Sequence, residues 1–241
     1  MNAILETRDL SRRFGGVAAV DEVNFTLNEG ELRCLIGPNG AGKSTFFKML
    51  SGQLKPSEGQ VLFRGRDITG AEPHDIARSG IGIKTQVPSV YDGLSVTENI
   101  MLSAWRTRSK AEAASVVAGL LEQIRLTDLA GQLVGHLAHG QRQWVELGVV
   151  LAQDPALVLL DEPTAGMTLD EVESTAALIR DINHSYSMVV VEHDMKFIRM
   201  IAETVTVFHQ GKILAEDHVD AILRDAAVRD VYLGKQADRD A

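Results

Sequence analysis

The sequence predicts an α/β protein with a parallel β-sheet core, an antiparallel β subdomain at the N-terminal end and an inserted helical subdomain. Three observations predict this fold. Apolar alternations separated by polar breaks run through residues 4–27 and indicate short strands. Apolar runs typical of buried parallel strands occur at residues 31–36 and 157–160. Between these runs, residues 96–153 are rich in Ala, Leu, Glu and Arg, as helices are.

Taken in order, the N-terminal half predicts a strand, a loop and a helix. The run at 31–36 stops abruptly at Gly37, and residues 43–51 resume with helical periodicity. Further strands are predicted at residues 60–64 and 80–85.

The second half continues this pattern after a stretch that we expect to be helical throughout. Trp105 and Trp144 occupy helical positions there and are expected to pack. The remaining expected elements are a strand at 157–160, a helix at 170–183, a strand at 188–191, a hairpin formed by 205–208 and 213–215, a helix at 219–233 and a frayed end at 234–241.

Length and composition predict one domain. The chain has 241 residues, 45% of them hydrophobic, which is enough to bury a substantial core. The expected division is a β and α/β core at 1–86 and 154–216, a helical subdomain at 87–153 and a helical tail at 217–241. Cys34, the single cysteine, excludes an internal disulfide and is expected to be a buried thiol.

Charge and hydropathy limit the partners and the location that we expect. A net charge of −9 provides no broad cationic field, so we expect no nucleic-acid partner. No apolar run approaches the roughly 20 residues that span a bilayer, and the first residues lack the apolar segment of a secretory signal. We therefore expect the chain in the cytoplasm.

The glycine-rich segment after the first buried strand predicts ATP binding. It fits G-x-x-x-x-G-K-S/T between a predicted strand and a predicted helix, and it consists of Gly37, Pro38, Asn39, Gly40, Ala41, Gly42, Lys43, Ser44 and Thr45. Its glycines let backbone N–H groups approach the phosphates, Lys43 neutralises phosphate charge, and the Ser44 hydroxyl can bind Mg²⁺. The expected fold is therefore a P-loop NTPase core of the RecA-like type.

Two carboxylates follow the buried strand at 157–160. Asp161 and Glu162 thus lie at the carboxyl end of a second parallel strand, where open α/β sheets bind their ligands. Asp161 suits the Mg²⁺ shell, and Glu162 is placed to orient and polarise the attacking water. We therefore predict ATP hydrolysis.

Between the two motifs lies an L-x-x-G-Q element, directly before a helical pattern. With the phosphate loop and the Asp-Glu strand, its order and spacing resemble those of ATP-binding cassette (ABC) proteins over nearly the whole chain. The resemblance implies a head-to-tail dimer of two cassettes, in which ATP lies between one phosphate loop and the partner's L-x-x-G-Q element. In this chain the residues of that element are Ala138, His139, Gly140 and Gln141. A helix N-terminus is a suitable anion site for this role.

The resemblance assigns three further residues. Phe14 matches the aromatic residue that stacks on adenine, with packing in the core as the alternative. Gln86 matches the glutamine that contacts Mg²⁺ and the water, and His193 matches the histidine that contacts the γ-phosphate. The implied catalytic set is Glu162, His193 and Gln86, and the implied Mg²⁺ ligands are Ser44, Gln86 and Asp161.

Two positions depart from the family pattern. Ala138 replaces the usual Ser, so a hydroxyl that would cap the helix and donate to the γ-phosphate is missing, at a cost of about 1 kcal/mol. Residues 164–168, Thr-Ala-Gly-Met-Thr, also differ from the commonest pattern. Because neither change removes Lys43, Asp161 or Glu162, we still predict turnover.

The strings His-Gly-Gln-x-Gln-Trp and Ala-Gly-Met-Thr resemble the ATPase subunits of urea and branched-chain amino acid importers (UrtD and LivG types), and the urea type most. The implied partners are a second cassette, two transmembrane permease subunits and, indirectly, a solute-binding protein. The implied location is the cytoplasmic face of the inner membrane, with residues 87–94 in the groove that meets the permease. The alternatives are a branched-chain amino acid importer, a cassette ATPase acting on nucleic acid or cluster assembly, and a regulatory subunit that scarcely hydrolyses ATP.

Overall fold

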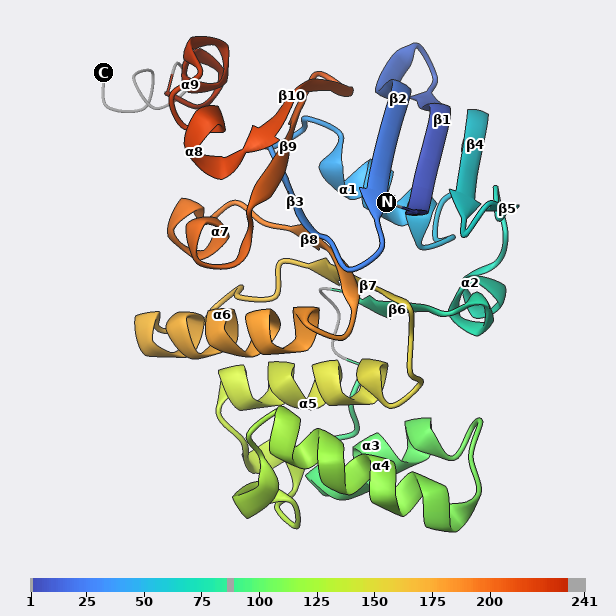
Figure 1. Cartoon of the computed structure of the whole chain (residues 1–241), viewed down its shortest axis with the longest axis vertical. Coiled ribbons are helices and arrows are strands. Elements are labelled where there is room, and N and C mark those ends of the chain that lie inside the picture. The colour runs from blue at the N-terminus through green and yellow to red at the C-terminus, as the bar shows by residue number, and fades with distance from the viewer. Residues whose placement is uncertain (1, 86–88, 234–241) are drawn as a thin grey trace.

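The computed structural model describes residues 2–85 and 89–233, and it contains two β-sheets (Figure 1). The antiparallel sheet has the order β2-β1-β4-β5 and consists of β1 (Ala3–Phe14), β2 (Val17–Asn28), β4 (Glu58–Phe63) and β5 (Arg66–Asp67). The second sheet has the order β10-β9-β3-β8-β7-β6 and consists of β3 (Leu32–Ile36), β6 (Ile81–Lys84), β7 (Leu157–Asp161), β8 (Ser187–Val191), β9 (Thr204–His209) and β10 (Lys212–His218). Its strands are parallel except for β10, which pairs antiparallel with β9. The expected fold class is confirmed.

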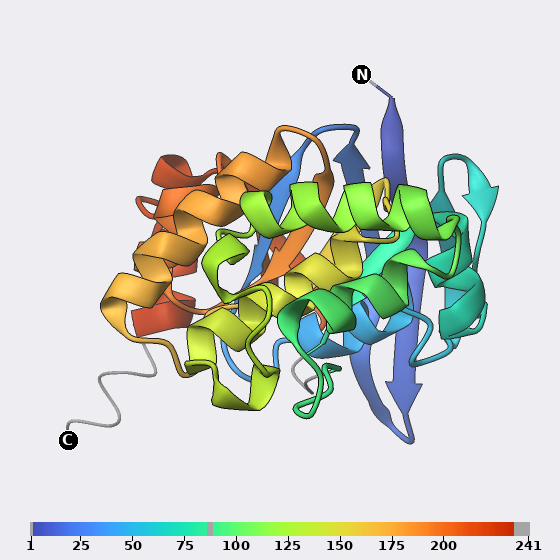
Figure 2. The ribbon, with the colours of Figure 1, turned by 90° about the horizontal axis from the view of Figure 1, so that it is seen from below.

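Helices α3 to α7 form a layer on one face of the second sheet and a subdomain beyond it, whereas α1 and α2 pack on the opposite face, toward the antiparallel sheet (Figures 1 and 2). The helices are α1 (Lys43–Leu50), α2 (Pro73–Ser79), α3 (Val96–Ala104), α4 (Lys110–Gln123), α5 (His139–Leu151), α6 (Leu169–Asn183), α7 (Met195–Ile201), α8 (Val219–Ile222) and α9 (Ala226–Leu233), with 3₁₀ turns η1 (Thr127–Leu129) and η2 (Val134–His136). Helix α5 lies between α6 and the pair α3 and α4.

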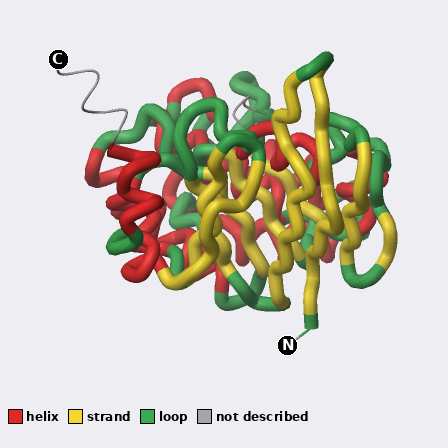
Figure 3. The backbone as a smooth tube through the Cα atoms, turned by 90° about the horizontal axis from the view of Figure 1, so that it is seen from above, coloured by secondary structure: helices red, strands yellow, loops and turns green. Residues whose placement is uncertain are grey.

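The two sheets are joined through α1. Strands β3, β7 and β8 are buried at every position, as is typical of mainly apolar strands in a parallel sheet covered on both faces. Phe46 of α1 packs edge-on against Phe25 of β2, with ring centroids 5.6 Å apart, and against Phe208 of β9 at 5.1 Å. This packing fixes the helix that follows the phosphate loop. Figure 3 shows the long β1–β2 hairpin beside the strands of the second sheet.

Side-chain caps define most of the helix starts around this core. Ser95, Ser109 and Thr168 each accept from the backbone N–H three residues later, at the starts of α3, α4 and α6. Helix α5 is held to its neighbours by two further bonds. The Trp144 indole N–H donates to Thr175 Oγ1 of α6 at 2.9 Å, and the Ser103 hydroxyl of α3 donates to the Val149 carbonyl at 2.7 Å.

The structure corrects three expectations about secondary structure. Residues 4–27 form two 12-residue strands rather than short ones, because irregularities at Asp9 and Glu22, both with positive φ, break the alternation without ending the pairing. The middle stretch is not helical throughout, since turns and 3₁₀ segments occupy much of 124–138. The helix expected at 219–233 is two helices, because the Asp225 side chain accepts from the Val228 N–H and starts α9 anew.

Cys34 and Trp144 are buried or partly buried as expected, but Trp105 is not. Cys34 is fully buried, as predicted, and burial raises the pKa of its thiol. Trp144 is partly buried and packs against the core. Trp105 does not pack as expected, because it lies at the C-terminal end of α3 and is 48% exposed.

Candidate functional site

The phosphate loop has the geometry that its sequence predicts. It connects the buried strand β3 to α1, and its glycines adopt left-handed backbone conformations. Gly37 has φ +149°, and a Cβ there would stand 2.3 Å from the Phe208 carbonyl oxygen. Gly42, with φ +108°, leaves no space either, since its Cβ would lie 2.4 Å from the Ala19 carbonyl oxygen. Glycine is therefore required at both ends of the loop.

The Lys43 side chain folds back and donates hydrogen bonds to the phosphate loop. Its ammonium group donates to the carbonyl oxygens of Gly37 at 2.5 Å and Pro38 at 3.1 Å. Burial lowers the pKa of Lys43, and the charges of Glu162 and Asp161 oppose that shift. The ammonium is thus held between the loop and the two carboxylates, where it can neutralise phosphate charge.

Asp161 and Glu162 lie at the carboxyl edge of the second sheet, as predicted. Asp161 ends β7, and burial together with the charge of Glu162 raises its pKa to about 6. Glu162 has φ +46°, a conformation that places its side chain at the turn after the strand, and its N–H donates to the Val191 carbonyl at 2.9 Å.

His193 joins this cluster from the loop after β8. Its Nδ1 lies 3.6 Å from Glu162 Oε1, and the ring is largely exposed. The structure therefore brings together Lys43, Asp161, Glu162 and His193, which are far apart in the sequence.

One residue of this cluster was missed by the sequence analysis. Glu192 precedes His193, is 1% exposed, and accepts hydrogen bonds from the backbone N–H groups of His193 at 2.8 Å and Thr164 at 3.3 Å. Its position directly before a predicted catalytic histidine was the only available signal.

Residues 138–141 begin α5 but contact a different part of the chain. His139 Nε2 lies 2.9 Å from the Ala165 carbonyl, and the Gly140 N–H donates to Glu171 Oε1 at 3.1 Å. Gln141 Oε1 accepts from the Ala138 N–H at 3.1 Å, whereas Ala138 has no side-chain acceptor to return the bond. The trans contact with a partner's ATP stays a prediction.

The remaining assigned residues differ in what the structure shows. Phe14, at the end of β1, is 48% exposed, so the alternative of packing in the core is wrong. The Arg12 guanidinium lies 4.8 Å from its ring centroid, and adenine stacking stays a prediction. Gln86 and residues 87 and 88 lie outside the described residues.

The residues present fit a magnesium ion. Ser44 and Asp161 offer the hydroxyl and carboxylate oxygens that Mg²⁺ prefers, and a divalent cation would offset the burial and repulsion that raise the pKa of Asp161. Within residues 2–85 and 89–233, no cluster of three His, Cys, Asp or Glu side chains could hold a metal by itself. Phosphate oxygens or water would have to supply the other ligands.

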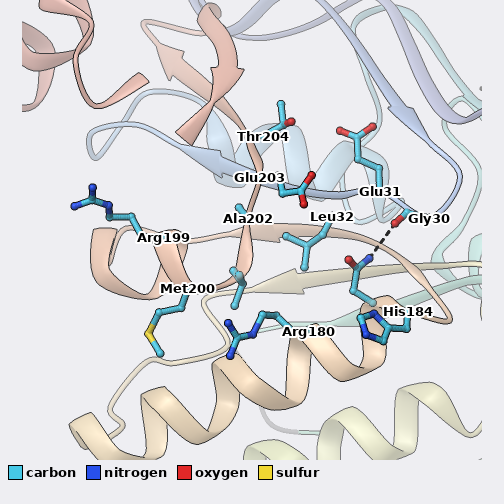
Figure 4. A pocket seen from close by; sticks show the side chains of 12 residues that line it. Gly30, Glu31, Leu32, Arg180, His184, Arg199, Met200, Ala202, Glu203 and Thr204 are labelled. Atoms are coloured by element: carbon cyan, nitrogen blue, oxygen red, sulfur yellow. Dashed lines mark hydrogen bonds between the residues drawn. The ribbon is translucent and has the colours of Figure 1, made fainter. Parts of the chain in front are cut away.

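A surface cavity of 460 Å³ lies at the opposite end of the sheet from the phosphate loop (Figure 4). It is bounded by the residues before β3, the end of α6 and the α7–β9 connection, where the Asn183 amide donates to the Gly30 carbonyl at 3.2 Å. Arg180 and Arg199 stand on one side of it, with Glu31 and Glu203 on the other. This cavity is therefore not part of the proposed ATP site.

A phosphate loop, a buried lysine and a carboxylate pair at the edge of a parallel sheet define a P-loop ATPase. Comparison with known proteins identifies the family. The profile of the family described as "ABC transporter" matches residues 20–165. This chain therefore belongs to the ABC transporter family, and it is an ATPase.

Individual relatives cover nearly the whole chain. The chain is 33% identical to the high-affinity branched-chain amino acid transport ATP-binding protein BraF of Pseudomonas aeruginosa, with 96% of this chain and 98% of BraF covered. It is 32% identical, with the same coverage, to LivG of Escherichia coli, which carries the same description. It is also 34% identical to the lipopolysaccharide export system ATP-binding protein LptB of Acidithiobacillus ferridurans, with 98% and 99% covered.

A solved structure of an ATP-binding cassette has the same fold as this chain. The ADP conformation of MJ1267, an ATP-binding cassette of an ABC transporter, superposes with a TM-score of 0.87 at 28% identity and covers 97% of this chain and 100% of that one. In the described part of the chain, no helix is long and apolar enough to cross a membrane.

Proposed function

We propose that this chain is the ATPase subunit of an importer for branched-chain amino acids. The likeness to BraF and LivG over nearly the full length carries this proposal. The sequence strings that resemble importer cassettes, at residues 139–144 and 165–168, support import over the export named for LptB. The resemblance to urea cassettes makes urea the second candidate, although the relatives described above are named for branched-chain amino acids.

The site supplies the chemistry of ATP hydrolysis from this chain's own residues. The phosphate loop and Lys43 bind the phosphates, and Ser44, Asp161 and Gln86 would hold a Mg²⁺ ion that would neutralise phosphate charge. Glu162 accepts the proton of the attacking water and orients it, and His193 contacts the γ-phosphate. Phe14 stacks on the adenine.

The second half of the site comes from a partner cassette in this proposal. The start of the partner's α5, with Ala138, His139, Gly140 and Gln141, faces the γ-phosphate and uses the positive end of the helix dipole. ATP binding closes the dimer and hydrolysis opens it. Because Ala138 offers no hydroxyl, the backbone alone provides this contact.

A surface groove beside β6 is the proposed meeting place with the permease. A 300 Å³ pocket there is lined by Ile83, Ser89, Tyr91, Asn99, Leu102, Ser103, Arg106, Val149, Val150 and Gln153. Tyr91 is 64% exposed, Leu102 43% and Trp105 48%, an apolar surface suited to a helix of a membrane subunit. The described part of residues 87–94 borders this groove, so the chain would lie against the cytoplasmic face of the membrane and not on nucleic acid.

Uptake measurements test the solute. Cells with and without the gene receive labelled leucine or labelled urea, and cells expressing Glu162→Gln serve as the inactive control. The proposal expects leucine uptake to depend on the active gene. Loss of urea uptake alone would favour the second candidate, and no change in either would exclude both solutes.

Turnover by Glu162→Gln in the assembled transporter tests the catalytic assignment. We expect ATP binding to persist and turnover to fall by about 100-fold or more, because the water loses its proton acceptor. Glu173→Gln, an exposed carboxylate on α6, is the matched control and should hydrolyse ATP at the wild-type rate. Wild-type turnover by Glu162→Gln would refute the role of Glu162.

A further inference from the structure

A buried carboxylate beneath the predicted catalytic residues has no role in the function proposed above. Glu192 follows β8 and is 1% exposed, although an ionised carboxylate is costly to bury. Its two oxygens accept from four donors in two separate loops, so hydrogen bonds within the protein replace those to water.

Each oxygen of Glu192 holds one of those loops. Oε1 accepts from the Thr164 hydroxyl at 2.5 Å and the Thr164 N–H at 3.3 Å. Oε2 accepts from the N–H groups of His193 at 2.8 Å and Asp194 at 3.4 Å. Thr164 stands two residues after Glu162, so one side chain ties the loop that carries Glu162 to the loop that carries His193.

The surroundings explain why the residue is a glutamate. All four donors are N–H or O–H groups, and a glutamine amide could accept on one side only, so its NH₂ would face donors on the other. An aspartate is one methylene too short to reach both loops. The imidazole of His193 lies between the two carboxylates, with Nδ1 3.7 Å from Glu192 Oε2 and 3.6 Å from Glu162 Oε1.

We propose that Glu192 is a positioning residue, which sets the separation of Glu162 and His193 by holding Thr164 and the His193 backbone on its two oxygens. This inference rests on the catalytic roles proposed for Glu162 and His193. A displacement of about 1 Å in such a pair can lower a rate by about 100-fold, so the effect belongs in kcat. ATP affinity should be spared, since Glu192 has no bond to the phosphate loop among those described.

Steady-state kinetics of the assembled transporter test this role with three variants. Glu192→Gln should lower kcat by about 10- to 100-fold and change KM for ATP by less than about threefold. Thr164→Val, which removes only the hydroxyl donor, should lower kcat by about threefold to tenfold. Thr164→Ser keeps that donor and should remain within about twofold of wild type.

The opposite results would overturn the proposal. A wild-type kcat for Glu192→Gln, or equal losses in Thr164→Val and Thr164→Ser, would mean that the bonds to Glu192 do not position the site. If Glu192→Gln fails to fold in a thermal unfolding experiment, the comparison of Thr164→Val with Thr164→Ser decides alone.

A double variant separates this inference from the proposed function. If Glu192 acts through Glu162, adding Glu192→Gln to Glu162→Gln should lower kcat by less than about twofold further. Multiplied effects of the two changes would show that Glu192 acts independently and would overturn the inference. Wild-type turnover by Glu162→Gln itself would instead refute the proposed function.

Discussion

Helices α1 and α5 both begin without a side-chain cap, but their N-termini differ in what surrounds them. The starts of α3, α4, α6 and α7 are capped by Ser, Thr or Asp side chains. At α1 the glycine loop curves over the helix start, and Lys43 bonds back to its carbonyls. At α5 the Gly140 N–H already donates to Glu171 of the same chain. The two helices assigned to phosphate are therefore uncapped, and only α5 has a carboxylate at its N–H groups.

The carboxylates beside the two helices show the same contrast. Near α1, burial and the charge of Glu162 raise the pKa of Asp161 to about 6. Near α5, hydrogen bonds from Thr168 and Gly140 lower the pKa of Glu171. The carboxylates near α1 repel each other, and a bound cation would stabilise them. The Glu171 carboxylate near α5 is already stabilised by hydrogen bonds from the protein. Charge at the α1 site thus favours Mg²⁺-ATP, and in the proposed dimer the α5 site would exchange the Glu171 carboxylate for a phosphate.

Lys43→Ala should have the largest effect of the substitutions at these two helix starts. Removing the ammonium leaves the loop carbonyls of Gly37 and Pro38 without their donor and the phosphates without a counter-charge. We expect ATP affinity to fall by about 100-fold. Titration with a fluorescent ATP analogue measures the loss, and Lys55→Ala, an exposed lysine paired with Glu72, is the control. Equal affinities in all three proteins would remove Lys43 from the site.

Alanine in place of glycine sharpens the comparison at both helix starts. At Gly42 a Cβ would meet the Ala19 carbonyl at 2.4 Å in a left-handed conformation, so we expect a loss of about 2–3 kcal/mol in unfolding free energy. At Gly140 it would meet the Glu171 carboxylate at 2.7 Å, a side chain that can turn away, and we expect a loss below about 1 kcal/mol. Urea denaturation measures both. Equal losses would contradict the distinction.

The pH dependence of stability tests the raised pKa of Asp161. Its pKa of about 6 in the folded chain exceeds the ordinary 3.8, so the folded state binds more protons than the unfolded state between these values. Stability from this group is present at low pH and decreases as pH rises toward 6. Asp161→Asn should therefore match wild type near pH 4 and exceed it by about 1 kcal/mol at pH 7, after allowance for solvent screening. Nucleotide-free urea denaturation at both pH values measures this, and a constant difference would contradict it.

Ala138→Ser has the smallest expected effect and makes α5 resemble the capped helices. Ala138 has φ −61° and ψ 158°, which is the conformation of an N-cap residue. A serine there should accept from the Gln141 N–H and stabilise the protein by about 1 kcal/mol relative to the wild type, with Ala138→Val as a control that adds no acceptor. Urea denaturation would detect the gain, and ATP-dependent dimerisation should strengthen with it. A serine variant no more stable than the wild type or the valine variant would count against the cap.

Local sequence was sufficient for the phosphate loop and for Asp161 and Glu162. Their positions depend on where a buried strand ends, and an apolar run shows that directly. The roles of Glu192 and Glu171 could not be predicted from the sequence, because their partners Thr164 and Gly140 lie 28 and 31 residues away. The buried ion pair of Lys84 with Glu146, at 3.4 Å between β6 and α5, was equally invisible. Hydrophobic periodicity carries no information about hydrogen bonds or ion pairs between segments that are distant in the sequence.

The sequence by itself determined the fold class, the order of the motifs and the positions of the phosphate loop and of the Asp161–Glu162 pair. These properties follow from hydrophobic periodicity and from glycines that only one backbone conformation accommodates. Tertiary structure alone decided the arrangement of the loops after β7 and β8, the exposure of Phe14 and Trp105, and the occupation of the α5 N-terminus by Glu171. These features arise from packing and from hydrogen bonds between distant segments, whose partners meet only after the sheet has assembled.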